Sequence, residues 1–212
     1  DVLEIYDPRQ DAWTQGSALP FALSAYGLVA FEGRLLLFGG WDGERYLDTV
    51  LEYDPGQDRW AELTPMPAAR AYPGAVVIGD RVYVIGGYDG KSALDRVDLY
   101  DPSEEGGEAD PWHEAAPLAE GRYGMGVVSL IDSIYVIGGQ GNRGATLPPL
   151  QYRPAQDAWE VFDQGAAESW SQGGLAVVGP NLHVLGGVQG EALSERHQAY
   201  QAIFFINMPV IR

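Results

Sequence analysis

A sequence repeat with a period of 47 to 52 residues constrains the fold of this chain more than any other feature. A Gly-Gly pair closes an apolar run four times, at Gly39-Gly40, Gly86-Gly87, Gly138-Gly139 and Gly186-Gly187. The same phase holds for five tyrosines and four tryptophans: Tyr6, Tyr53, Tyr100, Tyr152, Tyr200, Trp13, Trp60, Trp112 and Trp159. A period of this length, filled with short apolar segments, predicts a β-propeller or another repeat array.

Each repeat unit predicts four short antiparallel strands. In the second unit, residues 74–78 and 81–85 are apolar runs separated by the turn dipeptide Gly79-Asp80. Residues 95–100 alternate apolar and charged side chains, as a half-buried strand does. Trp112 marks the fourth strand. We call the strands a to d in chain order. Because glycines are frequent in strand a, we expect this strand to lie innermost at the crowded axis.

The sequence therefore predicts a single all-β propeller domain over residues 1–212. No segment between glycine or proline breaks is long enough for a helix of more than about two turns. The N-terminal unit holds only strands c and d, so we expect residues before Asp1 and a ring of six or seven blades in the native protein. The expected units are a half blade at 1–20 and complete blades at 21–66, 67–117, 118–165 and 166–212.

Composition narrows the classes of partner. The net charge is −17, which disfavours binding to nucleic acid or to anionic membrane surfaces and leaves basic or neutral partners. The chain has no cysteine, so disulfides and thiolate metal sites are excluded. No run approaches the roughly 20 apolar residues that span a bilayer. For the cellular location, we expect an extracellular or cell-envelope protein rather than a cytoplasmic one.

The double glycine after an apolar strand, followed by the phased tyrosine and tryptophan, resembles the kelch repeat, and the resemblance covers essentially the whole chain. WD-repeat propellers are the alternative, but Trp41-Asp42 is the one WD dipeptide and it does not end a strand. The kelch resemblance implies blades ordered a to d, with the double glycine ending strand b. It also implies protein binding through loops on one face. A minority of the family are enzymes, such as galactose oxidase and sialic acid mutarotases.

Two sets of loops are expected to share that face: those between strands b and c, and the segments that lead into strand a. The lead-in position, 16 residues before each double glycine, holds Leu23, Arg70, Arg122 and Trp170. Binding members of the family often present arginines there, so the resemblance implies that Arg70 and Arg122 contact a partner. The structural alternative is that they bond loop carbonyls or carboxylates. The full set of predicted partner-binding residues is Trp41, Arg45, Arg70, Tyr72, Tyr88, Arg122, Tyr123, Arg143, Trp170 and Gln189.

Catalytic and metal-binding signals are weak. His113, His183 and His197 are expected on different strands of different units, and no HxxH spacing exists, so we predict no metal site, no cofactor and no catalytic residue. Galactose oxidase chemistry needs a linked cysteine, which is absent. The leading hypothesis is a non-catalytic kelch scaffold that binds another protein. The alternatives are a carbohydrate-active or carbohydrate-binding propeller, mutarotase-like or lectin-like, and a structural subunit of a larger assembly.

Overall fold

A computed structural model describes residues 1–142, 147–162, 170–189 and 192–202. Within these ranges the regular structure consists of β-strands and two short 3-10 turns, Pro102–Glu104 and Pro154–Gln156, with no α-helix. The predicted all-β class is confirmed. Among the described residues, no helix has the length and apolar character needed to cross a membrane.

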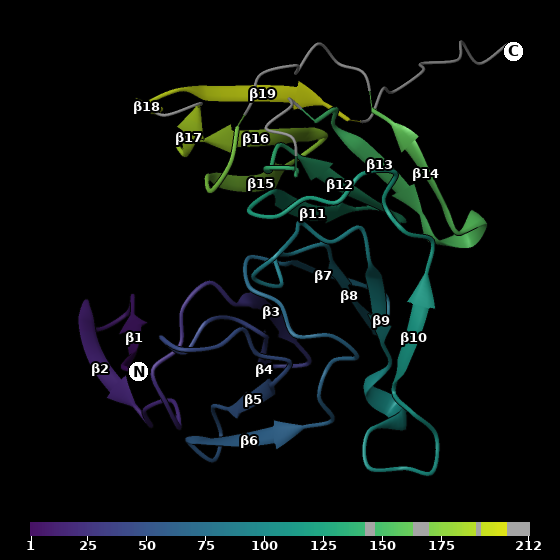
Figure 1. Ribbon diagram of the computed structural model, residues 1–212. Helices are drawn as coiled ribbons and strands as arrows, with labels where there is room; N and C mark the ends of the chain where they lie inside the picture. Colours follow the sequence, from purple (N-terminus) through teal and green to yellow (C-terminus); the bar gives the residue numbers. More distant parts are fainter. Residues whose placement is uncertain (143–146, 163–169, 190–191, 203–212) are drawn as a thin grey trace, which may run out of the picture.

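The strands form successive antiparallel sheets, one for each repeat unit (Figure 1). The N-terminal hairpin is β1 (Leu3–Asp7) and β2 (Ala12–Gly16). Three blades have four strands each: β3 (Gly27–Phe31), β4 (Arg34–Phe38), β5 (Val50–Asp54) and β6 (Arg59–Leu63); β7 (Gly74–Ile78), β8 (Arg81–Ile85), β9 (Val97–Tyr100) and β10 (Trp112–Ala115); β11 (Gly126–Leu130), β12 (Ser133–Ile137), β13 (Leu150–Arg153) and β14 (Ala158–Val161). We number them blades 1 to 3.

Blade 4 contains β15 (Gly174–Val178), β16 (Asn181–Leu185) and β19 (His197–Gln201), with a small hairpin of β17 (Val188–Gln189) and β18 (Ala192–Leu193) beside it. Its outer strand, expected around Phe204, lies outside the described residues. The propeller architecture, blades plus an N-terminal hairpin, is confirmed. The native number of blades and the boundaries between units stay predictions.

The inner strands β3, β7, β11 and β15 touch one another in sequence, so the blades fan around a common axis (Figure 1). Glycine makes this approach possible. A Cβ atom at Gly74 would lie 2.2 Å from Cγ2 of Val127 in the next blade, and one at Gly126 would lie 2.6 Å from Cβ of Leu175. The expectation that strand a is innermost is confirmed.

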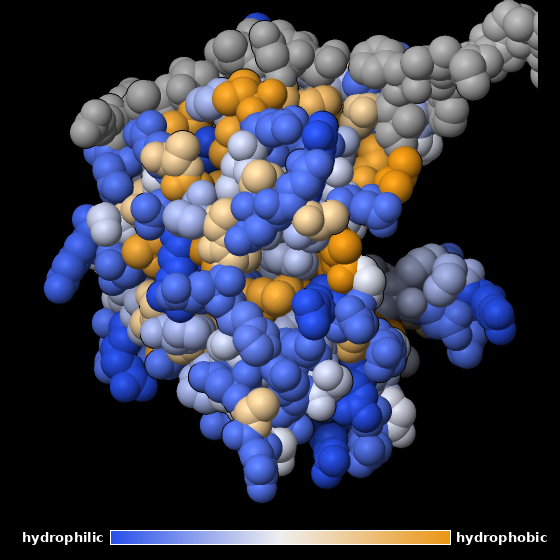
Figure 2. Space-filling model, turned by 90° about the vertical axis from the view of Figure 1, so that its right-hand side faces the viewer, coloured by the Kyte–Doolittle hydropathy of each residue, from blue (hydrophilic) through white to orange (hydrophobic). Residues whose placement is uncertain are grey.

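The hydrophobic core lies between the blades rather than within one of them. Phe38 and Val50 of blade 1 pack with Val82, Tyr100 and Trp112 of blade 2. Equivalent clusters join blade 2 to blade 3 and blade 3 to blade 4. The side of the molecule shown in Figure 2 is mainly hydrophilic, with apolar side chains in patches. Each blade is therefore stabilised by its neighbours, as expected for a repeat array.

The double glycine is the point where one blade holds the backbone of the next. The second glycine donates its N–H to the lead-in carbonyl of the following blade: Gly40 to Arg70 at 2.9 Å, Gly87 to Arg122 at 2.9 Å, and Gly139 to Trp170 at 2.6 Å. Gly39 and Gly40 have φ of 63° and 112°. A Cβ atom on Gly39 would meet the Arg70 carbonyl oxygen at 2.3 Å. Both positive φ and close approach therefore require glycine here.

A second set of bonds joins the blades around the axis. The residue two positions after each lead-in residue has positive φ: Ala25 (56°), Tyr72 (54°), Gly124 (63°) and Gln172 (55°). Their backbones bond in series. Tyr72 N–H donates to Ala25 C=O at 2.6 Å, Gly124 N–H to Tyr72 C=O at 3.1 Å, and Gln172 N–H to Gly124 C=O at 2.7 Å. We call this series the axial ladder.

Candidate partner-binding face

The two predicted loop sets do meet on one face of the propeller. In each blade, the residue after the lead-in position forms an antiparallel bridge with the residue after the double glycine: Ser24 with Trp41, Ala71 with Tyr88, Tyr123 with Gln140, and Ser171 with Val188. The Ala71–Tyr88 pair exchanges two backbone hydrogen bonds, at 2.9 and 2.7 Å. We call this surface the loop face. Its use as a binding surface stays a prediction.

The tips of the first two b–c loops are held by aspartate turns. Asp42 Oδ1 accepts the N–H groups of Glu44 and Arg45, both at 2.8 Å, and Asp89 Oδ1 does the same for Lys91 and Ser92. These backbone donors lower the pKa of both carboxyls. The aspartates therefore shape the turns. The Arg45 side chain is 76% exposed and lies 3.4 Å from Asp42 Oδ2.

Five aromatic rings form a continuous row across blades 1 to 3, which we call the aromatic row. The ring centroids are separated by 4.7 Å for Trp41–Tyr46, 5.6 Å for Tyr46–Tyr88, 5.1 Å for Tyr88–Tyr123 and 6.0 Å for Tyr123–Tyr72. Tyr72 is 40% exposed and the other four are partly exposed. The sequence predicted all of these residues except Tyr46. Its one signal was its place in the same b–c loop as Trp41.

The row continues into blade 4 through hydrogen bonds. Tyr123 donates its hydroxyl to Gln140 Oε1 at 2.8 Å, and Gln140 Nε2 donates to Ser171 Oγ at 3.1 Å. Burial raises the pKa of Tyr123, and the neighbouring tyrosines raise it further. The Tyr123 hydroxyl is therefore protonated at neutral pH and acts as a fixed donor.

Arg70 and Arg122 do not reach the surface, since they are 0% and 1% exposed. Arg70 Nη1 donates to the Gly86 carbonyl at 3.3 Å, and Arg122 Nη1 donates to the Gly138 carbonyl at 3.3 Å. The lead-in side chain thus supports the first glycine of its own blade. These contacts match the structural alternative weighed for the two arginines, and their contact with a partner stays a prediction.

Trp170 takes the same structural position in blade 4. Its indole Nε1–H donates to the Gly186 carbonyl at 2.6 Å, and the side chain is 8% exposed. Arginine and tryptophan thus make the same kind of contact here, because each donates an N–H to the carbonyl of the first glycine in its own blade. The sequence did not indicate this common role, because position 170 holds a tryptophan where the two preceding blades have an arginine.

The two arginines differ in their charge partners. Arg70 forms a buried ion pair with Asp98, whose carboxylate also receives Arg96 Nε at 2.7 Å. In blade 3 the position of Asp98 is taken by Leu150, two residues before the phased tyrosine. Arg122 therefore has carbonyl acceptors, Gly138 at 3.3 Å and Pro148 at 3.0 Å. Burial lowers the pKa of Arg122 to about 10.

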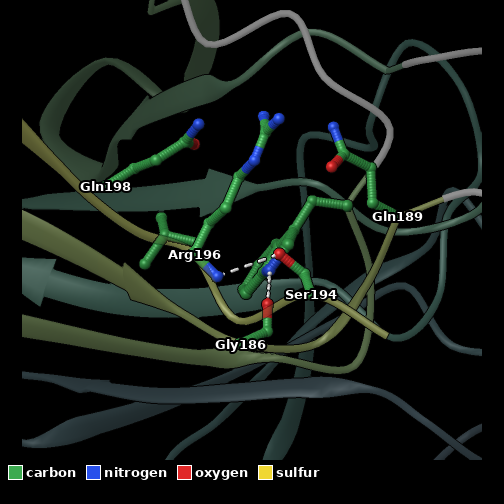
Figure 3. A pocket seen from close by; sticks show the side chains of 7 residues that line it. Gly186, Gln189, Ser194, Arg196 and Gln198 are labelled. Carbon is green, nitrogen blue, oxygen red and sulfur yellow. Dashed lines mark hydrogen bonds between the residues drawn. The ribbon is translucent and has the colours of Figure 1, made fainter. Parts of the chain in front are cut away.

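A small pocket lies beside Trp170 in blade 4 (Figure 3). Its cavity volume is only about 10 Å³, and the side chains of Gln189, Arg196 and Gln198 project toward the same side of it. Ser194 Oγ at its edge accepts the Arg196 N–H at 3.2 Å. Gln189 is thus separated from the aromatic row. The remaining predicted residue, Arg143, lies outside the described residues.

The histidines are less scattered than the sequence suggested. His183 on β16 and His197 on β19 belong to the same blade and lie 2.9 Å apart, Nδ1 to Nε2. The expectation that they fall in different units is wrong, because β16 and β19 are hydrogen-bonded neighbours. The described residues contain no group of three or more side chains suited to holding a metal ion.

Comparison with known proteins identifies the repeat. The family model described as the Kelch motif matches residues 22–67 and 69–118. Kelch-like protein 1 of Mus musculus is 40% identical over 50 residues, and Kelch-like protein 5 of Homo sapiens is 38% identical over 50 residues. Each match covers 24% of this chain and 7% of the relative. The similarity to these relatives is therefore confined to a small part of their length.

Proposed function

We propose that this chain, which is a kelch-repeat β-propeller, is a non-catalytic scaffold that binds another protein through its loop face. The aromatic row is the observation that supports this proposal. Its rings span three blades in mutual contact, so a partner can meet a broad, preformed apolar surface at little cost in side-chain entropy. Tyrosine and tryptophan are the residue types most enriched among interface hot spots.

The proposed contact residues are the five members of the row, with Arg45 at its margin. Arg70, Arg122 and Trp170 act indirectly, because their N–H donors fix the glycine carbonyls next to the b–c loops. The net charge of −17 favours a partner segment with basic side chains. An arginine or lysine over a tyrosine face would add a cation–π attraction to the apolar contact.

A displayed peptide library tests this proposal without a known partner. Peptides are selected on the wild-type protein and then compared for binding to a Tyr46→Ala, Tyr88→Ala double variant. We expect enriched peptides to carry aromatic or basic side chains and to lose at least about 30-fold in affinity on the double variant. Arg59→Ala, an exposed change on an outer strand, is the control. Peptides that bind all three proteins equally would place the binding surface elsewhere.

The two alternative functions stay open predictions. The polar rim of blade 4, formed by Gln189, Arg196 and Gln198, is where a carbohydrate would be sought, because amide and guanidinium groups suit sugar recognition while the cavity below them is too small to enclose a sugar. A glycan array probed with wild type and with Gln198→Ala would address this possibility, since a sugar held at this rim should be lost with the amide. A purely structural role in an assembly predicts no binding to either library.

A further inference from the structure

A cavity of about 210 Å³ lies between blades 1 and 2, at the strand ends opposite the loop face. Blade 1 contributes the turn between β3 and β4, with Phe31 and Arg34. Blade 2 contributes the start of the long connection between β9 and β10, with Pro102 and Glu105 (Figure 1). Both segments follow strand ends that point away from the b–c loops. The cavity is therefore separate from the aromatic row, and what it binds does not depend on the function proposed above.

The exchange of one tyrosine of the repeat for a leucine accounts for this cavity. The third residue of strand b is Leu36 in blade 1, Tyr83 in blade 2 and Tyr135 in blade 3. Between blades 2 and 3, the Tyr83 ring packs against the strand-c tyrosine of the next blade, Tyr152, with 5.6 Å between the ring centroids. Leu36 lies in one core cluster with Tyr100, the equivalent tyrosine, but it is shorter. The space that a phenol ring fills in one interface is thus left open in the other.

The cross-strand partner of Leu36 brings a charge into this space. Leu36 is paired with Glu52, whereas Tyr83 is paired with Leu99. The Glu52 side chain is 20% exposed and forms an ion pair with Arg34 through its Oε1 atom. Its second oxygen, Oε2, makes no hydrogen bond within the described part of the chain. Glu52 therefore has an acceptor available at the cavity.

The electrostatic potential inside the cavity is negative. Glu32, Glu52 and Glu105 line it, against one guanidinium, that of Arg34. Glu105 accepts the Tyr100 hydroxyl at 2.9 Å. Burial raises the pKa of Tyr100, and this bond and the charges of Glu105 and Glu52 raise it further. The two carboxylates thus act on the same point, where a cation is attracted and an anion is repelled.

We propose that the cavity binds an aliphatic amine, with the ammonium group at Glu52 and the alkyl chain in the space left open by Leu36. Phe31 and Leu63 complete the apolar lining that suits such a chain. A cavity of roughly 150 Å³ accepts a benzene ring, so this one has room for a chain of about five carbons. The amine is charged at neutral pH. A free alkylamine and the side chain of a lysine on another protein offer the same chemistry.

Isothermal titration of the 212-residue protein with three probes tests the charge and the source of the ligand. The probes are pentylamine, its uncharged analogue 1-pentanol, and Nα-acetyl-lysine N-methylamide. We expect pentylamine to bind saturably and 1-pentanol to bind roughly tenfold more weakly or worse, because it lacks the charge that Glu52 attracts. Tighter binding of pentylamine than of the lysine derivative identifies a free amine as the ligand, and the reverse order identifies a lysine side chain. Both orders support the proposal.

Two variants test the cavity with residues that the repeat already uses. Leu36→Tyr introduces the residue found at this position in blades 2 and 3, so it should fill the cavity, abolish binding and leave the melting temperature near that of wild type. Glu52→Gln introduces the residue that blade 3 has at this position, Gln151, and should weaken binding roughly tenfold or more. Glu62→Gln is the matched control, since it removes the same charge from an exposed position of β6 and should leave the affinity unchanged.

Pentylamine binding that persists in Leu36→Tyr would overturn the proposal, as would equal affinities for pentylamine and 1-pentanol. So would amine binding that the Tyr46→Ala, Tyr88→Ala double variant abolishes, because the amine would then lie on the aromatic row. The absence of saturable binding at every amine concentration at which the protein stays folded would do the same. If loop-face peptides fail to bind while pentylamine binds as expected, the cavity site stands and only the scaffold function is lost.

Discussion

Replacing Asp98 by leucine should remove a large part of the stability of blade 2. The Arg70 and Asp98 side chains are both 0% exposed, so the variant leaves a guanidinium in the interior without its carboxylate. The remaining acceptors of Arg70 are the Ala68 and Gly86 carbonyls, at 3.2 and 3.3 Å. Breaking a buried pair by removing one partner costs about 3 to 5 kcal/mol.

This cost should appear as a fall in melting temperature of roughly 6 to 20 °C, since 1 kcal/mol corresponds to about 2 to 4 °C in a domain of this size. Urea denaturation followed by tryptophan fluorescence gives the unfolding free energy directly. Arg96 should contribute little to the loss, because it keeps Glu114 at 3.0 Å and is 31% exposed. Leucine is a fair replacement because Leu150 stands at the equivalent position of blade 3.

The double variant Arg70→Met, Asp98→Leu distinguishes a buried charge from a packing defect. If the unpaired guanidinium causes the loss, removing it should recover stability, and the double variant should be more stable than Asp98→Leu alone. A loss below about 1 kcal/mol for the single variant, or a double variant no better than the single one, would refute the reasoning about the buried pair.

Three further outcomes are expected. Trp170→Leu should destabilise the protein by about 2 to 4 kcal/mol in thermal melts, because it leaves the Gly186 carbonyl without its donor and opens a cavity. Trp170→Arg should be much less destabilising, because arginine occupies this position in the two preceding blades. The pKa values of Tyr100 and Tyr152 are raised, mainly by burial and then by hydrogen bonds to carboxylates. Their contribution to the unfolding free energy is therefore complete below about pH 10 and is lost as the pH rises above it. Tyr152→Phe should reduce this loss of stability at high pH, measured by alkaline denaturation. Binding of loop-face peptides should weaken steadily between low and high salt if the acidic surface attracts basic side chains, and a salt-independent affinity in a titration series would count against that attraction.

The strands could be predicted from the sequence because they depend on local patterns. Residues 74–78 and 81–85 were expected as strands and form β7 and β8 with those bounds. Blade 2 has a longer connection between β9 and β10 than the other blades, which includes residues 103–110, and the structure explains why it is tolerated. Glu105 lies five residues after Tyr100, as Asp58 does after Tyr53, and it accepts the Tyr100 hydroxyl and the Thr64 N–H, both at 2.9 Å. Trp112 still donates to the Thr64 C=O at 3.1 Å, although it lies further along the chain.

The roles of individual site residues could be predicted less well, because they depend on how neighbouring blades meet. Arginine at the lead-in position looks the same in sequence whether it faces solvent or a glycine carbonyl. Arg70 is buried against the Gly86 carbonyl and the Asp98 carboxylate, 16 and 28 positions later in the chain, and no local pattern records these contacts. Likewise, Tyr46 joins the aromatic row by contact with Tyr88, 42 positions later in the chain and in another blade.

The axial ladder has a consequence for how such a scaffold can change its specificity. Its bonds run between main-chain atoms, so the spacing of the blades does not depend on which side chains the b–c loops carry. Tyr72 and Gln172 take part in this ladder through their backbones, with left-handed φ values of 54° and 55°. Residues 42–46 and 89–92 can therefore change by mutation, or be replaced by design, while the spacing between the blades stays the same.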